Sequence, residues 1–571
     1  MSEVPMSEVP SHRSEVFAVA DRFVDDWCAL HPIAATYYGV AGHDRELDDF
    51  SPAGTQRSVE LVEAALEALA TLEAVDDDDR LALAVASERM ASGHDLDQSG
   101  ESSRAFGVIS SPAMEIRQVF EMMAIEGAEA VDAVRARLEA VPLALARWRE
   151  TLDEHVGSGR TAARRHALGV ATQMREVADV GFPEVAARAA RASAGTAVAS
   201  GLDRAAGVAG RAYHEFADWL EGVYAPAADE TPFVGRERYG RWARHYTGLD
   251  LDLEETYAWG WEELSRITAR MVGLAEVLAP GAASLTEVAE RLDRDPRYVV
   301  RGTDELVARL RAFTDATVER LAGREFTIDE RIRFCDVRLA PEGSAAAPYY
   351  MPPSEDLARP GTTWFPTLGK EEFAWWRQVT TWYHEAVPGH HLEEGTVVIN
   401  AHRLTRYQRL MAWNSGWGEG WALYAERLMD ELGGFEEPAY EMGYLMSQAL
   451  RAARVVVDIG LHLQLPAPKD FGRLDGLGDV GGLPWTPEMA VAALVERALE
   501  PPDFARSEVE RYLAIPGQAI SYKVGEREWV GAREEMRAAR GAGFSLRDFH
   551  DRALALGPIG LGAFREALRR A

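Results

Sequence analysis

The sequence predicts a mainly α-helical protein that carries one small β-sheet. Apolar side chains recur at the period of a helix over long stretches of the chain. The first such stripe consists of Val16, Ala20, Phe23, Val24 and Trp27. Between Arg324 and Thr367 β-branched and aromatic residues alternate in short runs, which favours strands. Helical spacing returns from Lys370 and continues to the C-terminus.

This change of pattern divides the chain into three segments. Residues 1–13 are predicted to be a flexible N-terminus, and residues 14–323 a helical N-terminal portion. Residues 324–571 are predicted to hold the small sheet and the helices of a metal site. We expect this last segment to form one continuous body with the helical portion before it.

One run of the predicted sheet is a candidate for binding substrate. Gly361–Phe365 is expected to be an edge strand, because Pro366 follows within the same run. An edge strand can hold an extended peptide through backbone hydrogen bonds. Trp364, which lies in this strand, is therefore predicted to contact the substrate.

Composition and charge limit the possible partners. The 571 residues have a net charge of −31, which would repel the phosphates of a nucleic acid or of an anionic membrane, so neither is expected as a partner. The two cysteines are not spaced as a metal-binding pair, and a disulfide bond between them is not expected. There is no 18-residue uncharged apolar segment. The repeated M-S-E-V-P start does not have the pattern of a signal peptide, and the predicted location is the cytoplasm.

The densest chemical pattern is the stretch Thr380–Gly395, T-T-W-Y-H-E-A-V-P-G-H-H-L-E-E-G. His384 and Glu385 begin like the zinc-hydrolase signature H-E-x-x-H, but Pro388 stands where the second histidine is expected. In an unbroken helix His390 would lie about 120° around from His384, and His391 about 10 Å further along the axis. Neither could then share a metal with His384.

The pair Pro388–Gly389 offers a solution to this spacing. Proline removes a backbone donor and clashes with the preceding turn, and glycine accepts unusual dihedral angles. A break at this pair would turn one of the following histidines back toward His384. A metal site here therefore requires that the helix does not run straight through residues 388 and 389.

The run N-S-G-W-G-E-G-W-A-L-Y-A-E-R, residues 414–427, supplies a candidate third ligand. Glu419 lies between two glycines at the start of a predicted helix. There it could bind a metal, or its charge could simply interact favourably with the helix dipole. Glu426 lies two turns further on the same face. It could orient a metal-binding histidine from behind, or form an ordinary surface pair within the helix.

Two later stretches could complete a site. One predicted helix carries a polar stripe that either lines a cleft or forms a buried network of salt bridges. The stripe consists of Arg451, Arg454, Asp458 and His462. The run P-G-Q-A-I-S-Y-K is expected to open a helix at Pro516, with Gln518 and Tyr522 facing a cleft. Tyr522 could donate a hydrogen bond to an oxyanion, or could be a packed tyrosine.

Three motifs carry a resemblance to a known family. H-E-A-V-P-G-H-H-L, G-W-G-E-G-W-A-L-Y-A-E and P-G-Q-A-I-S-Y resemble a bacterial domain-of-unknown-function family of metallopeptidase-like proteins. That family is in turn similar in fold to the Taq-type metallocarboxypeptidases. The resemblance implies a large, mainly helical metallopeptidase-like fold with a small sheet next to a central groove. It also implies that His390 is the second ligand and Glu419 the downstream ligand, with His391 as the alternative.

These expectations describe a zinc metallopeptidase that acts on short peptides or small amides. Zn²⁺ would be held by His384, His390 and Glu419, and Glu385 would take the proton of the attacking water. The predicted binders of substrate are Trp364, Arg451, Arg454, His462 and Gln518. Two rival functions use the same residues: an Fe²⁺ enzyme with two histidines and one carboxylate, and a binding protein without catalysis.

Overall fold

The computed structural model describes residues 14–192, 201–340 and 347–570 and is mainly helical, as predicted. The predicted flexible segment 1–13 lies outside the described residues. The first predicted stripe lies on the first helix, where Val16, Ala20, Phe23 and Val24 are buried. Among the described residues, no helix is both long enough and apolar enough to cross a bilayer.

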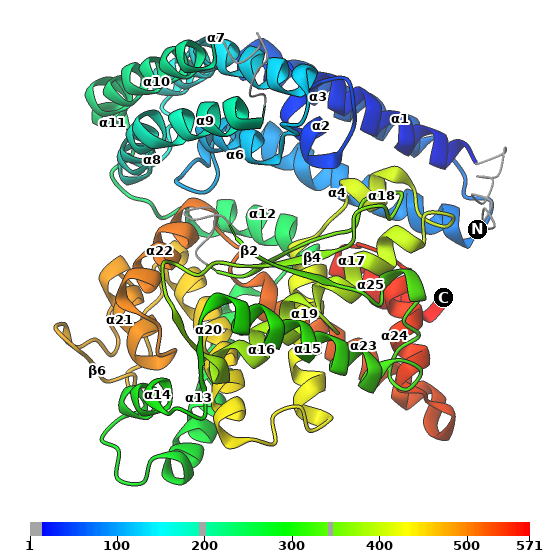
Figure 1. The fold of residues 1–571 in the computed structure, drawn as a ribbon, viewed down its shortest axis with the longest axis vertical. Coiled ribbons are helices and arrows are strands. Elements are labelled where there is room, and N and C mark those ends of the chain that lie inside the picture. Colours follow the sequence, from blue (N-terminus) through cyan, green and yellow to red (C-terminus); the bar gives the residue numbers. More distant parts are fainter. Residues whose placement is uncertain (1–13, 193–200, 341–346, 571) are drawn as a thin grey trace.

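The N-terminal helices form one layer, which lies at the top of Figure 1. They are α1 (Glu15–Leu30), α2 (Pro32–Tyr38), α3 (Pro52–Ala70), α4 (Asp77–Gln98), α5 (Glu101–Arg104), α6 (Pro112–Met122), α7 (Ala128–Ser158), α8 (Arg164–Glu176), α9 (Phe182–Ala192), α10 (Leu202–Trp219) and α11 (Ala225–Ala227). Single turns of π-helix follow α8 and α10, at Val177–Gly181 and Leu220–Tyr224.

The later helices form the body below this layer. They are α12 (Gly235–Thr247), α13 (Leu253–Leu278), α14 (Leu285–Arg294), α15 (Thr303–Leu321), α16 (Trp375–Glu385), α17 (His390–Ile399), α18 (Arg406–Leu410), α19 (Ser415–Glu431), α20 (Pro438–Leu463), α21 (Pro487–Arg497), α22 (Pro502–Ala514), α23 (Ser521–Arg540), α24 (Leu546–Ala555) and α25 (Leu561–Arg570). Short 3₁₀ turns lie at Glu330–Ile332 and Gly541–Gly543.

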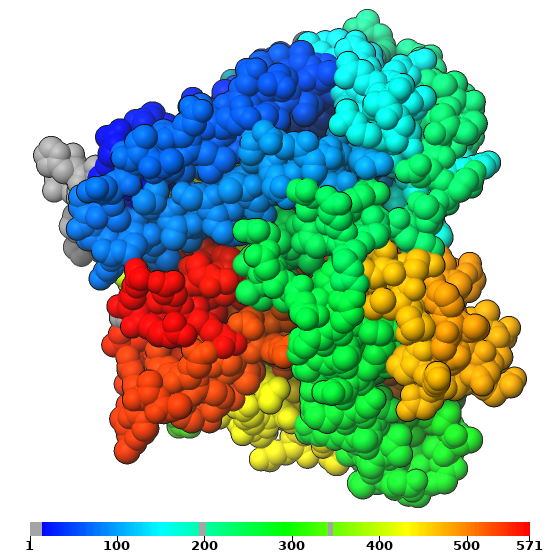
Figure 2. Space-filling model, turned by 180° about the vertical axis from the view of Figure 1, so that it is seen from behind, coloured from blue at the N-terminus to red at the C-terminus, as the bar shows by residue number. Residues whose placement is uncertain are grey.

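The upper layer and the body are packed together. One buried apolar cluster includes residues from α1, α3 and α4 and extends to Leu568 in the last helix, while a second cluster is confined to the outer helices of the upper layer. Helix α4 contacts α12, α18 and α25. Seen from behind, the C-terminal helices lie directly below the N-terminal ones (Figure 2).

The strands are short, and those in the described ranges form three small sheets. They are β1 (Val299–Arg301), β2 (Asp336–Leu339), β3 (Tyr349–Met351), β4 (Thr362–Phe365), β5 (Glu372–Ala374), β6 (Arg473–Leu474) and β7 (Gly478–Asp479). β1 pairs with β5, and β6 with β7. The sheet beside α17 has the order β2-β4-β3, with β4 parallel to β2 and antiparallel to β3.

This order corrects the prediction of an edge strand at Gly361–Phe365. β4 is the central strand, so both of its edges already pair with neighbouring strands, and it cannot receive a substrate backbone. Pro366 misled the prediction because it follows the last paired residue, where no ladder hydrogen bond is required of it. Trp364 stacks on Tyr349 and lies against Arg338, so its side chain packs against neighbours on the same sheet.

The polar stripe of α20 belongs mainly to a buried network. The Arg454 guanidinium donates to Glu508 Oε2 on α22 at 2.7 and 3.0 Å, and Arg511 donates to the same atom at 2.9 Å. These charges hold the pKa of the Glu508 carboxyl well below its usual value, against the opposing effect of burial. Arg454 therefore neutralises a buried carboxylate, and its predicted role in binding substrate stays a prediction.

Replacing Glu508 by glutamine is expected to lower the free energy of unfolding by about 3 to 5 kcal/mol. The change keeps the side-chain shape but leaves two largely buried guanidinium groups without their counter-charge. Urea unfolding curves measure the loss. The matched control is Glu510→Gln on the same helix, which breaks an exposed pair with Arg165 and should cost at most about 1 kcal/mol. Equal effects of the two substitutions would contradict this account.

Candidate metal centre

The helix that carries the first histidine breaks at the predicted place. α16 ends at Glu385 and α17 begins at His390, so the chain between them is not a continuous helix. The backbone N–H of Gly389 donates to Tyr383 O at 3.0 Å, which folds the link back on the end of α16. Trp421 Nε1 donates to the carbonyl oxygens of Pro388 and Gly389, at 2.9 and 3.2 Å, and so fixes the link against α19.

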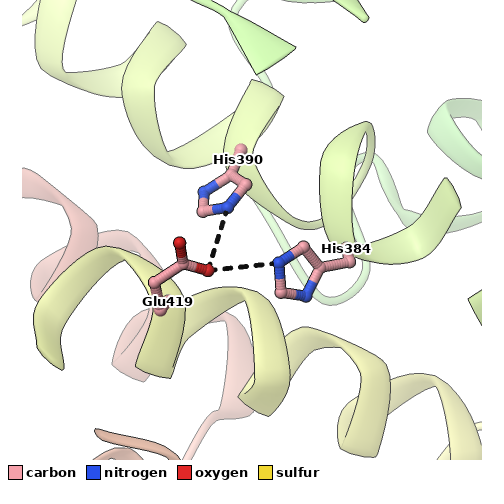
Figure 3. A group of neighbouring side chains, drawn as sticks. All are labelled: His384, His390 and Glu419. Carbon is pink, nitrogen blue, oxygen red and sulfur yellow. Dashed lines mark ion pairs between the residues drawn. The ribbon is translucent and has the colours of Figure 1, made fainter. Parts of the chain in front are cut away.

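The break brings two histidines and one glutamate together (Figure 3). His384 Nε2 lies 3.3 Å from Glu419 Oε2, and His390 Nε2 lies 3.6 Å from the same oxygen. Neighbouring ligand atoms of a tetrahedral zinc site lie about 3.4 Å apart, given metal–ligand distances near 2.1 Å. Glu419 Oε2 is buried and has no hydrogen-bond partner among the described residues. The three side chains therefore fit a divalent metal in spacing and in chemistry.

Close packing of two helices positions Glu419. Asn414 caps α19 by accepting a hydrogen bond from Trp417 N, which starts the helix five residues before Glu419. A Cβ atom on Gly420 would lie 2.5 Å from the Cα of Gly525, so glycine at both positions is what lets α19 and α23 approach. The same approach brings the Tyr522 ring on α23 to 6.4 Å from the His384 ring, nearly parallel to it.

Glu426 holds the first histidine from behind. His384 Nδ1 donates to Glu426 Oε1 at 2.9 Å, and the other oxygen accepts from Thr380 Oγ1 at 2.7 Å and from Ser447 Oγ at 3.0 Å. Glu426 is fully buried, which excludes the predicted alternative of a surface pair. Arg451 in turn donates to Ser447 Oγ at 2.7 Å. This arrangement fixes the imidazole tautomer and leaves Nε2 free to bind a metal.

Replacing Glu426 by glutamine is expected to weaken zinc binding about 10- to 100-fold, because His384 would lose its charged acceptor. A competition titration with a chromogenic chelator measures the affinity. Glu436→Gln changes an exposed glutamate and should leave the affinity at the wild-type value. An unchanged affinity in Glu426→Gln would show that this carboxylate does not support a metal ligand.

The third histidine of the motif faces away from this group. His391 Nε2 donates to Ile332 O at 2.7 Å, and Nδ1 accepts from the Tyr350 hydroxyl at 3.0 Å. Burial lowers the pKa of His391 to about 4, so the ring is neutral. Both of its nitrogens are engaged, and of the two candidates only His390 points at Glu419.

The pKa values of the ionisable groups near the histidines are shifted in different directions. The two imidazoles lower the pKa of Glu419 well below its usual value, against the opposing effect of burial. Burial raises the pKa of the Glu385 carboxyl, which lies next to His384 in the chain. Burial and then the Glu419 charge raise the pKa of Tyr522, so its hydroxyl stays protonated and can donate.

Two other predicted binders of substrate lie elsewhere. His462 is buried, donates from Nε2 to Tyr512 O at 3.0 Å, and accepts at Nδ1 from Val234 N at 3.3 Å. It therefore joins helices inside the body, and its predicted role in binding is corrected. Gln518 bonds to Ser415 and to Arg511.

The helix predicted to open at Pro516 begins at Ser521 instead. Residues 515–520 form a turn, in which Gly517 has a φ of +79° and donates its N–H to Asp458 Oδ2 at 2.9 Å. This bond to α20 keeps the segment out of the helix. Gln518 and Tyr522 therefore do not share a helical face, and only Tyr522 lies beside the histidines.

Two acidic residues near the site were missed by the sequence analysis. Glu393 is buried and lies 3.5 Å from His390 Nδ1, and Glu394 is next to it on α17. Burial and then the Glu393 charge raise the pKa of Glu394 to about 8. The signal was present in the motif itself, since Glu393 follows His390 by three residues and so shares its helical face.

Comparison with solved structures finds the same fold in other proteins. A structure described as a putative lipoprotein from Colwellia psychrerythraea matches with a TM-score of 0.83 and 19% identity, covering 97% of this chain and 98% of that chain. A putative lipoprotein of unknown function from Shewanella oneidensis matches with a TM-score of 0.74 and 19% identity, covering 98% and 100%. Comparison with curated proteins gives no match.

These neighbours contradict the predicted cytoplasmic location. A lipoprotein is attached to a membrane by its lipid, and both of these solved structures are described as putative lipoproteins. The prediction was wrong because it rested on the pattern at the start of the sequence, whereas the fold itself is not tied to the cytoplasm.

A family model confirms the bacterial family of unknown function that the three motifs resemble. It is described as a bacterial protein of unknown function (DUF885), and it matches residues 32–568. The match includes both histidines, Glu419 and all three motifs. The chain therefore belongs to this bacterial family.

Proposed function

We propose that the protein is a metal-dependent hydrolase, specifically a zinc metallopeptidase that acts on short peptides or small amides. The observation that carries this proposal is the convergence of His384 Nε2 and His390 Nε2 on Glu419 Oε2, at 3.3 and 3.6 Å. A buried carboxylate oxygen with two imidazole nitrogens is a ligand set for zinc that leaves room for a water. The resemblance of the motifs to those of Taq-type metallocarboxypeptidases supports the same activity.

Zinc bound there would supply Lewis acidity and would lower the pKa of a water toward neutrality. Glu385 is the group that can take the proton of this water. Its side chain is at the end of α16, immediately after a ligand, and is 9% exposed. The raised pKa of Glu385 suits a residue that accepts a proton from the attacking water and then passes it to the leaving amine.

Tyr522 and Arg451 are further candidates for contact with substrate. The Tyr522 hydroxyl stays protonated and can donate a hydrogen bond to the oxyanion that forms on the carbonyl oxygen when water attacks the carbonyl carbon. Arg451 is partly exposed and lies 5.9 Å from the Tyr522 ring, which places a guanidinium beside the site. Such a group can pair with the terminal carboxylate of a short peptide.

Digestion of a short-peptide library tests the proposal. The purified protein is compared before and after removal of metal with a chelator, and again after zinc is added back. We expect cleavage that disappears with the metal and returns with zinc. Cleavage that persists without metal, or none under any condition, would contradict the proposal. Activity that returns only with Fe²⁺ would favour the rival iron enzyme.

A further inference from the structure

A second group of acidic atoms lies beside the candidate metal centre. His390, Glu393 and Glu394 each offer one atom, and the three atoms lie within 4.8 Å of one another. The Glu393 side chain is 1% exposed, and its Oε1 is buried without a hydrogen-bond partner in the part of the chain that the structure describes. Glu394, the outer member of this group, is partly exposed.

The balance of charge indicates that this group binds a cation. The carboxyl groups gathered around the two histidines are those of Glu385, Glu393, Glu394, Glu419 and Glu426. Because a buried polar atom is costly without a partner, the orphaned oxygen of Glu393 calls for a further group that can donate a hydrogen bond to it. A positively charged donor would also favour the ionised form of the neighbouring Glu394 carboxyl.

The chemistry of His390 argues against a second metal as that group. If Nε2 of His390 binds the first metal, the neutral ring carries its proton on Nδ1. That N–H points to Glu393 Oε2, at 3.5 Å, and cannot ligate another ion. Only two carboxylates then remain, which are fewer than the three protein ligands of a catalytic zinc site. Two acceptor groups do suit an ammonium group, which has three N–H donors.

We propose that Glu393 and Glu394 bind the α-ammonium group of the substrate, so that the site cleaves peptides close to a free amino terminus. This inference rests on the proposed function and identifies the end of the peptide, the amino terminus, near which the peptide is cleaved. Glu393 lies at Nδ1 of the His390 ring, and Nε2, the nitrogen that faces the metal, lies on the other side of the same ring. Since successive Cα atoms are about 3.8 Å apart, the cleaved bond follows the first or second residue of the peptide.

Binding of paired peptides tests the inference independently of turnover. Calorimetric titration of trialanine and of N-acetyl-trialanine into the zinc-loaded Glu385→Gln protein gives two dissociation constants. We expect trialanine to bind about 10- to 100-fold more tightly, because acetylation removes the charge. Glu394→Gln in the same background should reduce this preference at least tenfold. Glu276→Gln, a change at an exposed glutamate of α13, should preserve it.

The outcomes separate the inference from the proposed function. Equal binding of the two peptides, or no binding of either, would overturn the inference, and a preference that survives in Glu394→Gln would do the same. A second equivalent of zinc that is lost in Glu394→Gln would assign the group to a metal instead. Hydrolysis by the wild-type protein is measured separately, and its absence would overturn the proposed function whatever the binding preference.

Discussion

Replacing Glu385 by glutamine is expected to reduce peptide hydrolysis about 100- to 10,000-fold while zinc stays bound. The amide keeps the size of the side chain but cannot accept the proton of the attacking water. The metal should remain, because the three atoms that converge belong to His384, His390 and Glu419. The measurement is kcat/KM on a short peptide together with the zinc content of the same sample.

The control for this variant is Glu371→Gln, an exposed change just before α16. It should leave both kcat/KM and zinc content at wild-type values. Hydrolysis at the wild-type rate by Glu385→Gln would remove this residue from the mechanism. Loss of zinc in Glu385→Gln would instead indicate that the carboxylate supports the metal centre.

Replacing Gly389 by alanine is expected to weaken zinc binding by at least about 100-fold. A Cβ atom at this position would lie 1.8 Å from His384 O and 2.6 Å from Tyr383 O, far inside contact distance. Both are backbone atoms, so the link between α16 and α17 must move. Because this link sets the position of His390 relative to His384, a shift separates the two ligands. A competition titration with a chelator measures the affinity.

Gly93→Ala is the matched control for this variant. Gly93 lies within α4, and a Cβ atom there would meet nothing within 4 Å. Alanine favours a helix over glycine by up to about 1 kcal/mol, so the control should be as stable as the wild type or slightly more stable, with unchanged zinc affinity. Wild-type affinity in Gly389→Ala would show that the tight link does not determine the metal centre.

Local patterns were enough to predict the helix break in the histidine motif and the shared face of Glu419 and Glu426. Pro388 and Gly389 predicted a break in the helix, and the break is present between α16 and α17. The two-turn spacing of Glu419 and Glu426 predicted that both face the same side, and both contact His384. These predictions succeeded because they depend on backbone geometry over a few residues.

Predictions that depended on distant partners failed. The place of β4 in its sheet is decided by pairing with residues 336–339 and 349–351, which no single run of sequence reveals. The sequence left open whether the stripe that includes Arg454 forms a salt-bridge network, because its partner Glu508 lies 54 residues away in the chain. The late start of α23 depends on a hydrogen bond from Gly517 N to Asp458 on another helix.

The metal content of purified protein tests the central claim most directly. Elemental analysis is applied to the wild type and to Glu419→Gln, whose neutral amide is a much poorer ligand than a carboxylate. We predict one zinc per wild-type chain and little or none in the variant. Protein without zinc, or equal zinc in the wild type and in Glu419→Gln, would contradict a metal centre formed by His384, His390 and Glu419.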